Sequence, residues 1–257
     1  MNDNEKIDAV EAVPEYSIEV DNVRKYYRIY KDKGSQLRDR ILTLGRSKYN
    51  EHLVLDGISL KIKRGEAVGF IGVNGCGKST LLKMLSRIIY PNSGSITTYG
   101  RISGLIELGA GFHPDMTGRE NIYINASIYG LSRAEIDAKI EDIIDFSGIR
   151  DAIDTPVRTY SSGMYMRLGF AVAINVNADI LLVDEILAVG DAAFQAKCFD
   201  ALRTLKANGV TIVIVSHSLG QIEEICDKTY WIANGKLKME GEPKAVHAAY
   251  EKEVFGG

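Results

Sequence analysis

The chain has 257 residues, of which 46% are hydrophobic and 25% are charged, the balance of an ordinary soluble globular protein. Its formal net charge of −3 gives no general reason to expect nucleic acid as a partner. The cysteines at 76, 198 and 226 are an odd set with no close pair, which argues against a disulfide framework or a zinc site and favours a reducing cytosol. We see no signal peptide and no run of the roughly eighteen apolar residues that a membrane helix needs, so any membrane must be crossed by another chain.

The first part of the chain alternates between polar and strand-like segments. Residues 1–15 are polar and acidic and are expected to form a flexible tail. Residues 16–23 and 53–62 have the pattern of strands. The segment between them, 24–48, is rich in lysine and arginine, and apolar residues recur in it at helical spacing. It is either a short basic amphipathic helix near anionic headgroups or pyrophosphate, or a solvated charged loop, which we favour.

The rest of the chain alternates between strand and helix patterns. Residues 67–71, 180–183 and 210–215 are short apolar runs, typical of parallel strands covered on both faces. Ser132 and Glu135 form a capping box at the start of an amphipathic helix. The pattern predicts an α/β domain over residues 16–245 with a parallel-sheet core, a helical insertion at about 118–174, and a short C-terminal tail over 246–257.

The segment GVNGCGKST follows a predicted strand and opens a predicted helix, and it fits the phosphate-loop pattern G-x-x-x-x-G-K-[ST]. Consecutive backbone amides and the helix N-terminus would bind phosphate, Lys78 would neutralise the β- and γ-phosphates, and Ser79 would ligate Mg²⁺. A glycine-rich turn that matches by chance is the alternative. Because Cys76 lies inside the loop, we expect a bulky thiol reagent to inhibit. The nucleotide-binding residues predicted here are Gly72, Asn74, Gly75, Cys76, Gly77, Lys78, Ser79 and Thr80.

Two carboxylates, Asp184 and Glu185, end the apolar run 180–183. The carboxyl end of a buried strand lies beside the phosphate loop in such sheets. Asp184 is expected to hold Mg²⁺ and Glu185 to orient the attacking water, because phosphoryl transfer depends mainly on positioning and charge neutralisation. Two solvated acids at a strand end are the alternative.

The order of these motifs, with Tyr160-Ser161-Ser162-Gly163-Met164 about twenty residues before the carboxylates, resembles the ATP-binding-cassette (ABC) ATPases. The resemblance implies a P-loop NTPase cassette with a parallel-sheet core, an N-terminal antiparallel β subdomain and a helical signature subdomain. It also implies that the signature of one subunit caps the ATP held by the other. The Ser161 hydroxyl and the Gly163 amide would then contact the γ-phosphate across a homodimer, with Ser162 between them in the nucleotide-binding segment, although Ser161 also fits the N-cap of the next helix.

The same resemblance assigns roles to four further residues. His217 follows an apolar strand and corresponds to the family's γ-phosphate histidine, and Asp191 corresponds to its dimer-contact aspartate. Tyr27, with Tyr26 as second choice, would stack on the adenine, unless it is simply a surface tyrosine. Glu107 replaces the glutamine that links Mg²⁺ to the transporter partner in most relatives.

The signature departs from the usual leucine-serine-glycine-glycine-glutamine, and it resembles the branch that exports O-antigen, capsule or teichoic acid. The segments ELGAGFHPDMTGREN and VGD resemble the same branch. The expected function is ATP hydrolysis with Mg²⁺ at the cytoplasmic face of the bacterial inner membrane. A homodimer would work there with two permease subunits to move a lipid-linked glycan. The competing class is a soluble ABC ATPase of the translation or DNA-repair type, which usually carries two cassettes or a long coiled coil. No carbohydrate-binding domain is expected after residue 245.

Overall fold

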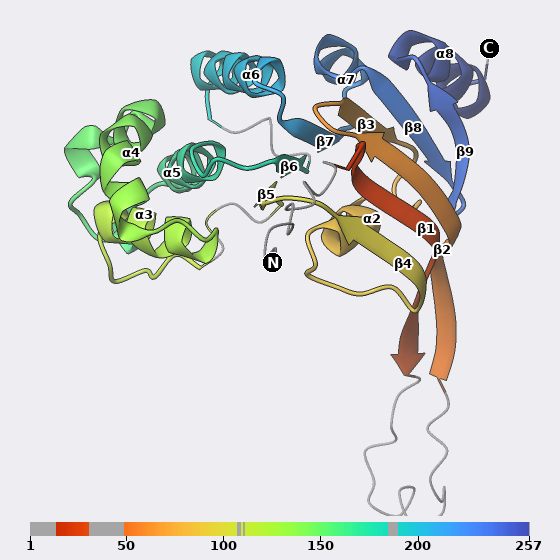
Figure 1. The fold of residues 1–257 in the computed structure, drawn as a ribbon, viewed down its shortest axis with the longest axis horizontal. Helices are drawn as coiled ribbons and strands as arrows, with labels where there is room; N and C mark the ends of the chain where they lie inside the picture. Colours follow the sequence, from red (N-terminus) through yellow and green to blue (C-terminus); the bar gives the residue numbers. More distant parts are fainter. Residues whose placement is uncertain (1–13, 31–48, 107–108, 110, 185–189, 257) are drawn as a thin grey trace, which may run out of the picture.

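The structure is a computed structural model that describes residues 14–30, 49–106, 109, 111–184 and 190–256 (Figure 1). Its strands are β1 (Tyr16–Tyr30), β2 (Tyr49–Lys63), β3 (Ala67–Ile71), β4 (Ser93–Thr98), β5 (Ile102–Leu105), β6 (Ile180–Val183), β7 (Thr211–Val215), β8 (Lys228–Ala233) and β9 (Lys236–Gly241). Its α-helices are α2 (Lys78–Leu85), α3 (Gly118–Ile128), α4 (Arg133–Ser147), α5 (Ser162–Ile174), α6 (Ala192–Ala207), α7 (Leu219–Ile225) and α8 (Pro243–Val254).

Six of the strands form a mixed sheet in the order β5-β6-β7-β3-β8-β9. All neighbours in it are parallel except β8 and β9, which pair antiparallel. Every residue of β3, β6 and β7 is buried, which explains why these strands appear in the sequence as unbroken apolar runs. The expected α/β fold with a largely parallel core is confirmed.

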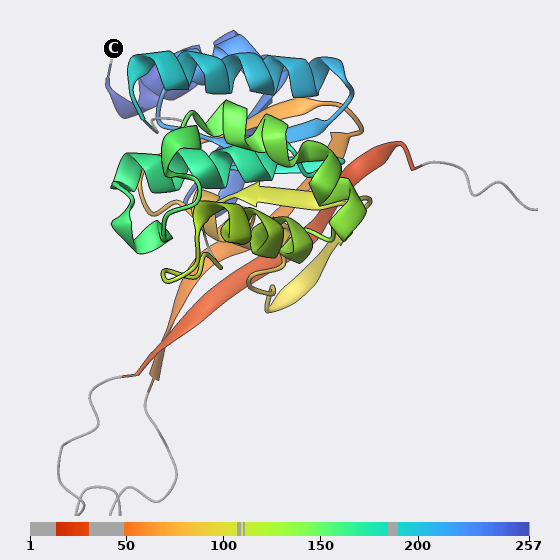
Figure 2. The same ribbon diagram turned by 90° about the vertical axis from the view of Figure 1, so that its left-hand side faces the viewer.

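The other sheet is antiparallel, in the order β2-β1-β4. Its first two strands are longer than predicted, because residues 24–30 and 49–52 continue the hairpin. This far part of the hairpin projects from the body of the protein (Figures 1 and 2). Residues 24–30, the start of the predicted basic segment, are therefore strand, and neither a helix nor the favoured charged loop forms there. Residues 31–48, with the apolar positions of the expected helix, lie outside the described residues.

Helices cover the mixed sheet on one face, and the antiparallel sheet with α2 covers the other (Figure 1). Side chains alternate accordingly: Val68, Phe70 and Val213 pack with α2 and the antiparallel sheet, whereas Ile212 and Ile214 pack with α6 and α7. The Tyr230 hydroxyl donates to the Lys61 carbonyl oxygen at 2.8 Å and ties the two sheets together. The phosphate loop directly follows β3, and β3 is buried in the close-packed three-layer core.

Helices α3, α4 and α5 gather at one end of the sheet and have a hydrophobic cluster of their own (Figures 1 and 2). The predicted capping box is present, with the Ser132 hydroxyl accepting from the Glu135 amide and the Glu135 carboxylate accepting from Ser132. Thr117 and Glu120 form a second box at the start of α3. These helices lie inside the range that was expected to form the helical insertion.

Helix α8 crosses residue 245, where the expected domain boundary lies. Pro243 opens it at a position where a proline costs no hydrogen bond. Val246 and His247 are buried, and the Tyr250 ring meets Trp231 edge-on with centroids 5.4 Å apart. The segment after residue 245, which was expected to be a short C-terminal tail, is thus packed helix as far as Val254, and its apolar side chains cover β8. Among the described residues, no helix is both long and apolar enough to span a membrane.

Candidate functional site

Three neighbouring parallel strands end at the same edge of the mixed sheet. Strand β6 pairs with β7, and β7 pairs with β3, so the residues that follow these strands are brought together. They are Asp184 after β6, Ser216 and His217 after β7, and Gly72 after β3. Ligands bind at this edge in open α/β sheets. The structure therefore brings together three of the predicted motifs that are far apart in the sequence.

Two glycines shape the phosphate loop. Gly72 leaves β3 with φ of 146°, and a Cβ there would lie 2.2 Å from the Ile232 carbonyl oxygen. Gly77 is the N-cap of α2 with φ of 109°, and a Cβ there would lie 2.4 Å from a methyl carbon of Leu55. Any larger residue would clash at either position. The chain can therefore turn from the buried strand directly into α2, whose N-terminal amides and dipole favour an anion.

Lys78, the first residue of α2, is buried, with 5% of its surface exposed. Its ammonium group donates to the Gly72 carbonyl oxygen at 2.7 Å and to the Val73 carbonyl oxygen at 3.1 Å. A buried ammonium must be paired or hydrogen-bonded. The lysine thus folds back over the loop, where its charge is available to phosphate oxygens.

A cavity of about 280 Å³ lies at the loop. It is lined by His52, Val54, Asn74, Gly75, Gly77, Lys78, Ser79 and Thr80. Six of these belong to the predicted phosphate loop. His52 and Val54 of β2 were missed by the sequence analysis, because no local motif marks them and only the packing of the hairpin places them there. Gly72 and Cys76 are not among the lining residues, although both were predicted to bind nucleotide.

The Cys76 side chain points away from the cavity. It is 4% exposed and belongs to the hydrophobic cluster around α2 and the antiparallel sheet. The expectation of a reagent-accessible thiol is therefore wrong, because the turn of the loop directs this side chain into the core. Only its backbone amide remains available, and here that amide donates to the Val73 carbonyl oxygen at 3.3 Å.

We therefore expect the native protein to react slowly with a bulky thiol reagent. Cys198 and Cys226 are also buried, and desolvation raises the pKa of each thiol to about 12, which removes the reactive thiolate at neutral pH. Thiol titration should show slow labelling in buffer and labelling of all three cysteines in denaturant. Rapid native labelling of Cys76 that ATP blocks would contradict this orientation.

Tyr27 lies on the far part of the hairpin, directly opposite His52. Paired residues of antiparallel strands place their side chains on the same face, so Tyr27 faces the side of the hairpin that borders the cavity. Its side chain is 42% exposed, and the Lys25 ammonium lies 5.2 Å from its ring centroid. Tyr26, the second candidate, lies on the opposite face with Arg28 at 6.0 Å from its ring centroid. The geometry favours Tyr27 over Tyr26 for adenine stacking.

The signature residues begin α5. The Ser161 side chain is the N-cap and accepts from the Met164 amide at 3.2 Å, so the expected capping role is confirmed. Ser161 and Ser162 are exposed, and Gly163 is half-buried. None of the three is among the described residues that line the cavity of the same chain. Their predicted contact with ATP across a dimer remains a prediction.

Asp191 has a role within the chain that the sequence analysis did not foresee. It is the N-cap of α6, where its carboxylate accepts from the Phe194 amide at 2.9 Å. The same carboxylate pairs with the Arg167 guanidinium of α5 at 2.7 Å. The amide of Phe194, and after it the Arg167 charge, hold the pKa of Asp191 below its usual value. Asp191 therefore links the signature helix to α6, and its predicted contact with a second subunit remains untested.

The remaining predicted residues divide into two groups. His217 is exposed and Asp184 is half-buried, and each makes a contact within the chain. Glu107 and Glu185 lie outside the described residues, so their roles stay predictions.

The chemistry of the loop fits a nucleotide with Mg²⁺. The cavity offers the Ser79 hydroxyl and the Lys78 ammonium, and Asp184 ends a strand two places from β3 in the sheet. Mg²⁺ prefers oxygen ligands and is usually held by one or two protein groups together with substrate phosphates. Ser79 and Asp184 are the protein oxygens that match this preference.

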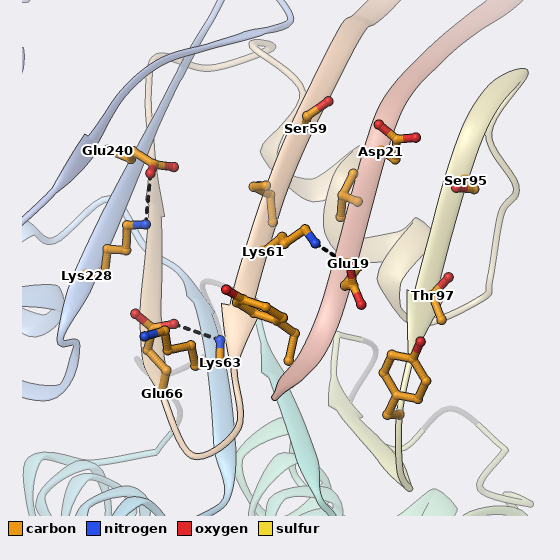
Figure 3. A pocket seen from close by; sticks show the side chains of 14 residues that line it. Glu19, Asp21, Ser59, Lys61, Lys63, Glu66, Ser95, Thr97, Lys228 and Glu240 are labelled. Carbon is orange, nitrogen blue, oxygen red and sulfur yellow. Dashed lines mark hydrogen bonds and ion pairs between the residues drawn. The ribbon is translucent and has the colours of Figure 1, made fainter. Parts of the chain in front are cut away.

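A larger cavity of about 830 Å³ lies on the outer face of the antiparallel sheet (Figure 3). Four of its charged side chains form ion pairs, Lys61 with Glu19 at 2.7 Å and Lys228 with Glu240 at 3.0 Å. Its lining includes no residue of the phosphate loop among those described. We therefore place the nucleotide in the smaller cavity, where the residues that bind phosphate converge.

Comparison with known proteins agrees with this geometry. Residues 55–188 match the family described as ABC transporter. The chain is 45% identical to the O-antigen export system ATP-binding protein RfbB of Klebsiella pneumoniae over 239 residues, covering 91% of this chain and 97% of the relative. It is 46% identical to the teichoic acids export ATP-binding protein TagH of Levilactobacillus brevis over 92% of this chain and 65% of the relative.

A solved structure described as an ATP-binding subunit of an ABC transporter has the same fold. It superposes with a TM-score of 0.74 at 21% identity, covering 92% of this chain and 94% of the other. The cavity at the phosphate loop, the strand ends beside it and these matches agree with one another. The chain belongs to the ABC transporter family, as a subunit that binds ATP with Mg²⁺ and hydrolyses it.

Proposed function

We propose that this chain is the ATPase subunit of an exporter of lipid-linked cell-surface polysaccharide, at the cytoplasmic face of the bacterial inner membrane. The observation that carries the proposal is 45% identity over 91% of the chain to a protein named for O-antigen export. The teichoic-acid relative supports the same class of cargo. These relatives favour export over the soluble translation or repair class.

Two copies of the chain would form the working ATPase. The cavity is lined by β2 and the phosphate loop, whereas the N-terminus of α5 presents exposed Ser161 and Ser162 elsewhere on the same chain. A symmetric pair would bring the α5 N-terminus of one subunit over the loop of the other, and its positive dipole end would face the γ-phosphate. Each ATP would then be enclosed only in the dimer.

Within such a site, the chain's residues have separable roles. Lys78 and the loop amides would bind and neutralise the phosphates, and Ser79 with Asp184 would hold Mg²⁺, which would supply further charge neutralisation on the phosphate oxygens. Glu185 orients the attacking water, and His217 donates a hydrogen bond to the γ-phosphate. ATP favours the closed dimer and hydrolysis reopens it, so the membrane partner would contact two different states.

A third cavity offers a surface for the two membrane-spanning partners. It measures about 590 Å³ and lies between α2, β5 and α3. Its lining includes Ile88 and Ile128, which are 51% and 65% exposed, and Ile106, the residue before Glu107. Exposed apolar side chains around a hollow mark interaction sites. We propose that a segment of the permease binds here, next to the position that resembles the family's link between Mg²⁺ and the transporter.

Replacing Ile128 by Glu tests this surface. We expect the variant to keep the ATPase activity of the isolated chain and to lose co-purification with its membrane-spanning partner. Met239→Glu, at a site on β9 that is 36% exposed, is the matched control and should retain the permease. Co-purification of Ile128→Glu at the parental level would place the partner elsewhere.

The transport function is tested by deleting the chain from its host. We expect the surface polysaccharide to disappear and its lipid-linked precursor to accumulate inside the cell. Complementation by the parental chain should restore the surface polymer, and complementation by Lys78→Ala should not. A deletion strain with normal surface glycan and a defect in translation or DNA repair would support the soluble class instead.

A further inference from the structure

The nucleotide cavity has one histidine among the described residues of its lining. His52 of β2 lines the cavity together with the phosphate loop, and its imidazole is exposed. We propose that His52 is a second nucleotide-binding residue of the hairpin, which contacts the ribose-proximal phosphates of the bound nucleotide. The proposal deepens the nucleotide site and rests on it.

The residues of the β1–β2 hairpin indicate how a nucleotide would be oriented in the cavity. His52 and Val54 of β2 both line the cavity, whereas Asn50, the next residue outward on the face of His52, does not. Tyr27 pairs with His52 across the hairpin and shares its face. With its phosphates at the loop, a bound nucleotide would extend its base toward Tyr27. His52 lies between the phosphate loop and Tyr27. The ribose and its nearest phosphate would therefore lie beside His52.

The charges around the cavity favour an anion beside His52. The ionisable side chains facing it are Lys78 from α2 and, across the hairpin, Tyr27 and Lys25. No carboxylate is among the described residues that line the cavity. The Lys25 ammonium is already engaged, because it donates to the Tyr90 carbonyl oxygen at 2.7 Å and lies over the Tyr27 ring. A protonated imidazole at position 52 would therefore meet phosphate without a competing acid.

This position makes nucleotide affinity depend on pH. Histidine is the side chain that ordinarily changes charge between pH 5 and 8. A bound phosphate favours the protonated imidazole, so by linkage the protonated protein binds the nucleotide more tightly. Affinity should rise as pH falls from 8 to 6 and should do so through His52.

Calorimetry on the full chain tests this, with Mg²⁺-ADP and adenosine as the two probes. We expect the parental chain to bind ADP about two- to fivefold more tightly at pH 6 than at pH 8, the scale of one exposed ionic contact. His52→Gln should lose most of that difference, and adenosine should show none in either protein. Asn50→Ala, a change on the same face one position outward, should behave as the parent does.

Four outcomes are informative. His52→Gln with the parental pH dependence overturns the proposal, as does an equal loss in Asn50→Ala. If adenosine affinity depends on pH in the parental chain and His52→Gln removes that dependence, His52 contacts the nucleoside. That result also overturns the proposed phosphate contact. A parental chain that binds no ADP at either pH contradicts the nucleotide site itself, which separates that failure from failure of the histidine contact.

Discussion

Replacing Glu185 by Gln should lower ATP turnover at least 100-fold and leave ATP binding intact, the scale that a positioned proton acceptor contributes. The substitution keeps the size and hydrogen-bonding reach of the side chain but removes its charge. The phosphate loop would still bind ATP, and the closed pair would not reopen because hydrolysis is blocked. Phosphate release measures the turnover, and light scattering with Mg²⁺-ATP measures the dimer.

Glu141→Gln is the matched control for that experiment. Glu141 lies exposed on α4 and pairs with Arg119 and Arg150, away from the phosphate loop. It should keep parental turnover and should dimerise only transiently with ATP. If Glu185→Gln hydrolyses ATP at the parental rate, the water-orienting role does not belong to Glu185.

Replacing Lys78 by Ala should weaken Mg²⁺-ATP binding about 10- to 100-fold, since hydrogen bonds to charged groups contribute about 1.5–3 kcal/mol each. The structure adds a second reason for a large effect. The ammonium also holds the Gly72 and Val73 carbonyl oxygens, so its loss frees the loop as well as removing a charge. Calorimetry of ATP binding measures the change.

Lys83→Ala is the control that distinguishes the effect of a phosphate-loop lysine on ATP affinity from the effect of removing any positive charge from α2. Lys83 lies in the last turn of the same helix, outside the lining of the cavity. It should leave ATP affinity at the parental level. Equal affinities for Lys78→Ala and the parent would mean that the loop does not bind triphosphate through this lysine.

Features that depend on local chemistry could be predicted from the sequence. The phosphate loop is a continuous segment whose glycines and lysine determine its shape, and the Ser132 box needs only residues three apart. The strands β3, β6 and β7 are buried on both faces, so each was visible as an apolar run. Parallel pairing then places Asp184 and His217 beside the loop without further information.

Features that depend on tertiary packing were missed. The far part of the β1–β2 hairpin is exposed on both faces, so residues 24–30 lack the alternation that marks a half-buried strand. His52 reaches the cavity only through the register of that hairpin. The position of Cys76 follows from loop torsions at Gly72 and Gly77 rather than from its place in the motif.

The ion pair that links α5 and α6 could not be predicted from the sequence, for a related reason. Asp191 could be recognised as a residue similar to the family's interface aspartate, but its partner Arg167 is 24 residues away on another helix. Only the packing of the two helices brings the charges together. Helix α8 is similar, because the burial of Val246 and Tyr250 depends on Trp231 of β8.

The central claim is that each ATP is held by the phosphate loop of one subunit and the α5 N-terminus of the other. Mixing two inactive variants, Lys78→Ala and Ser161→Arg, tests it most directly. A mixed pair would join an intact loop to an intact α5 N-terminus at one of its two sites, so ATPase activity should return to as much as about a quarter of the parental rate. A mixture that stays as inactive as each variant alone would contradict a site shared between two subunits.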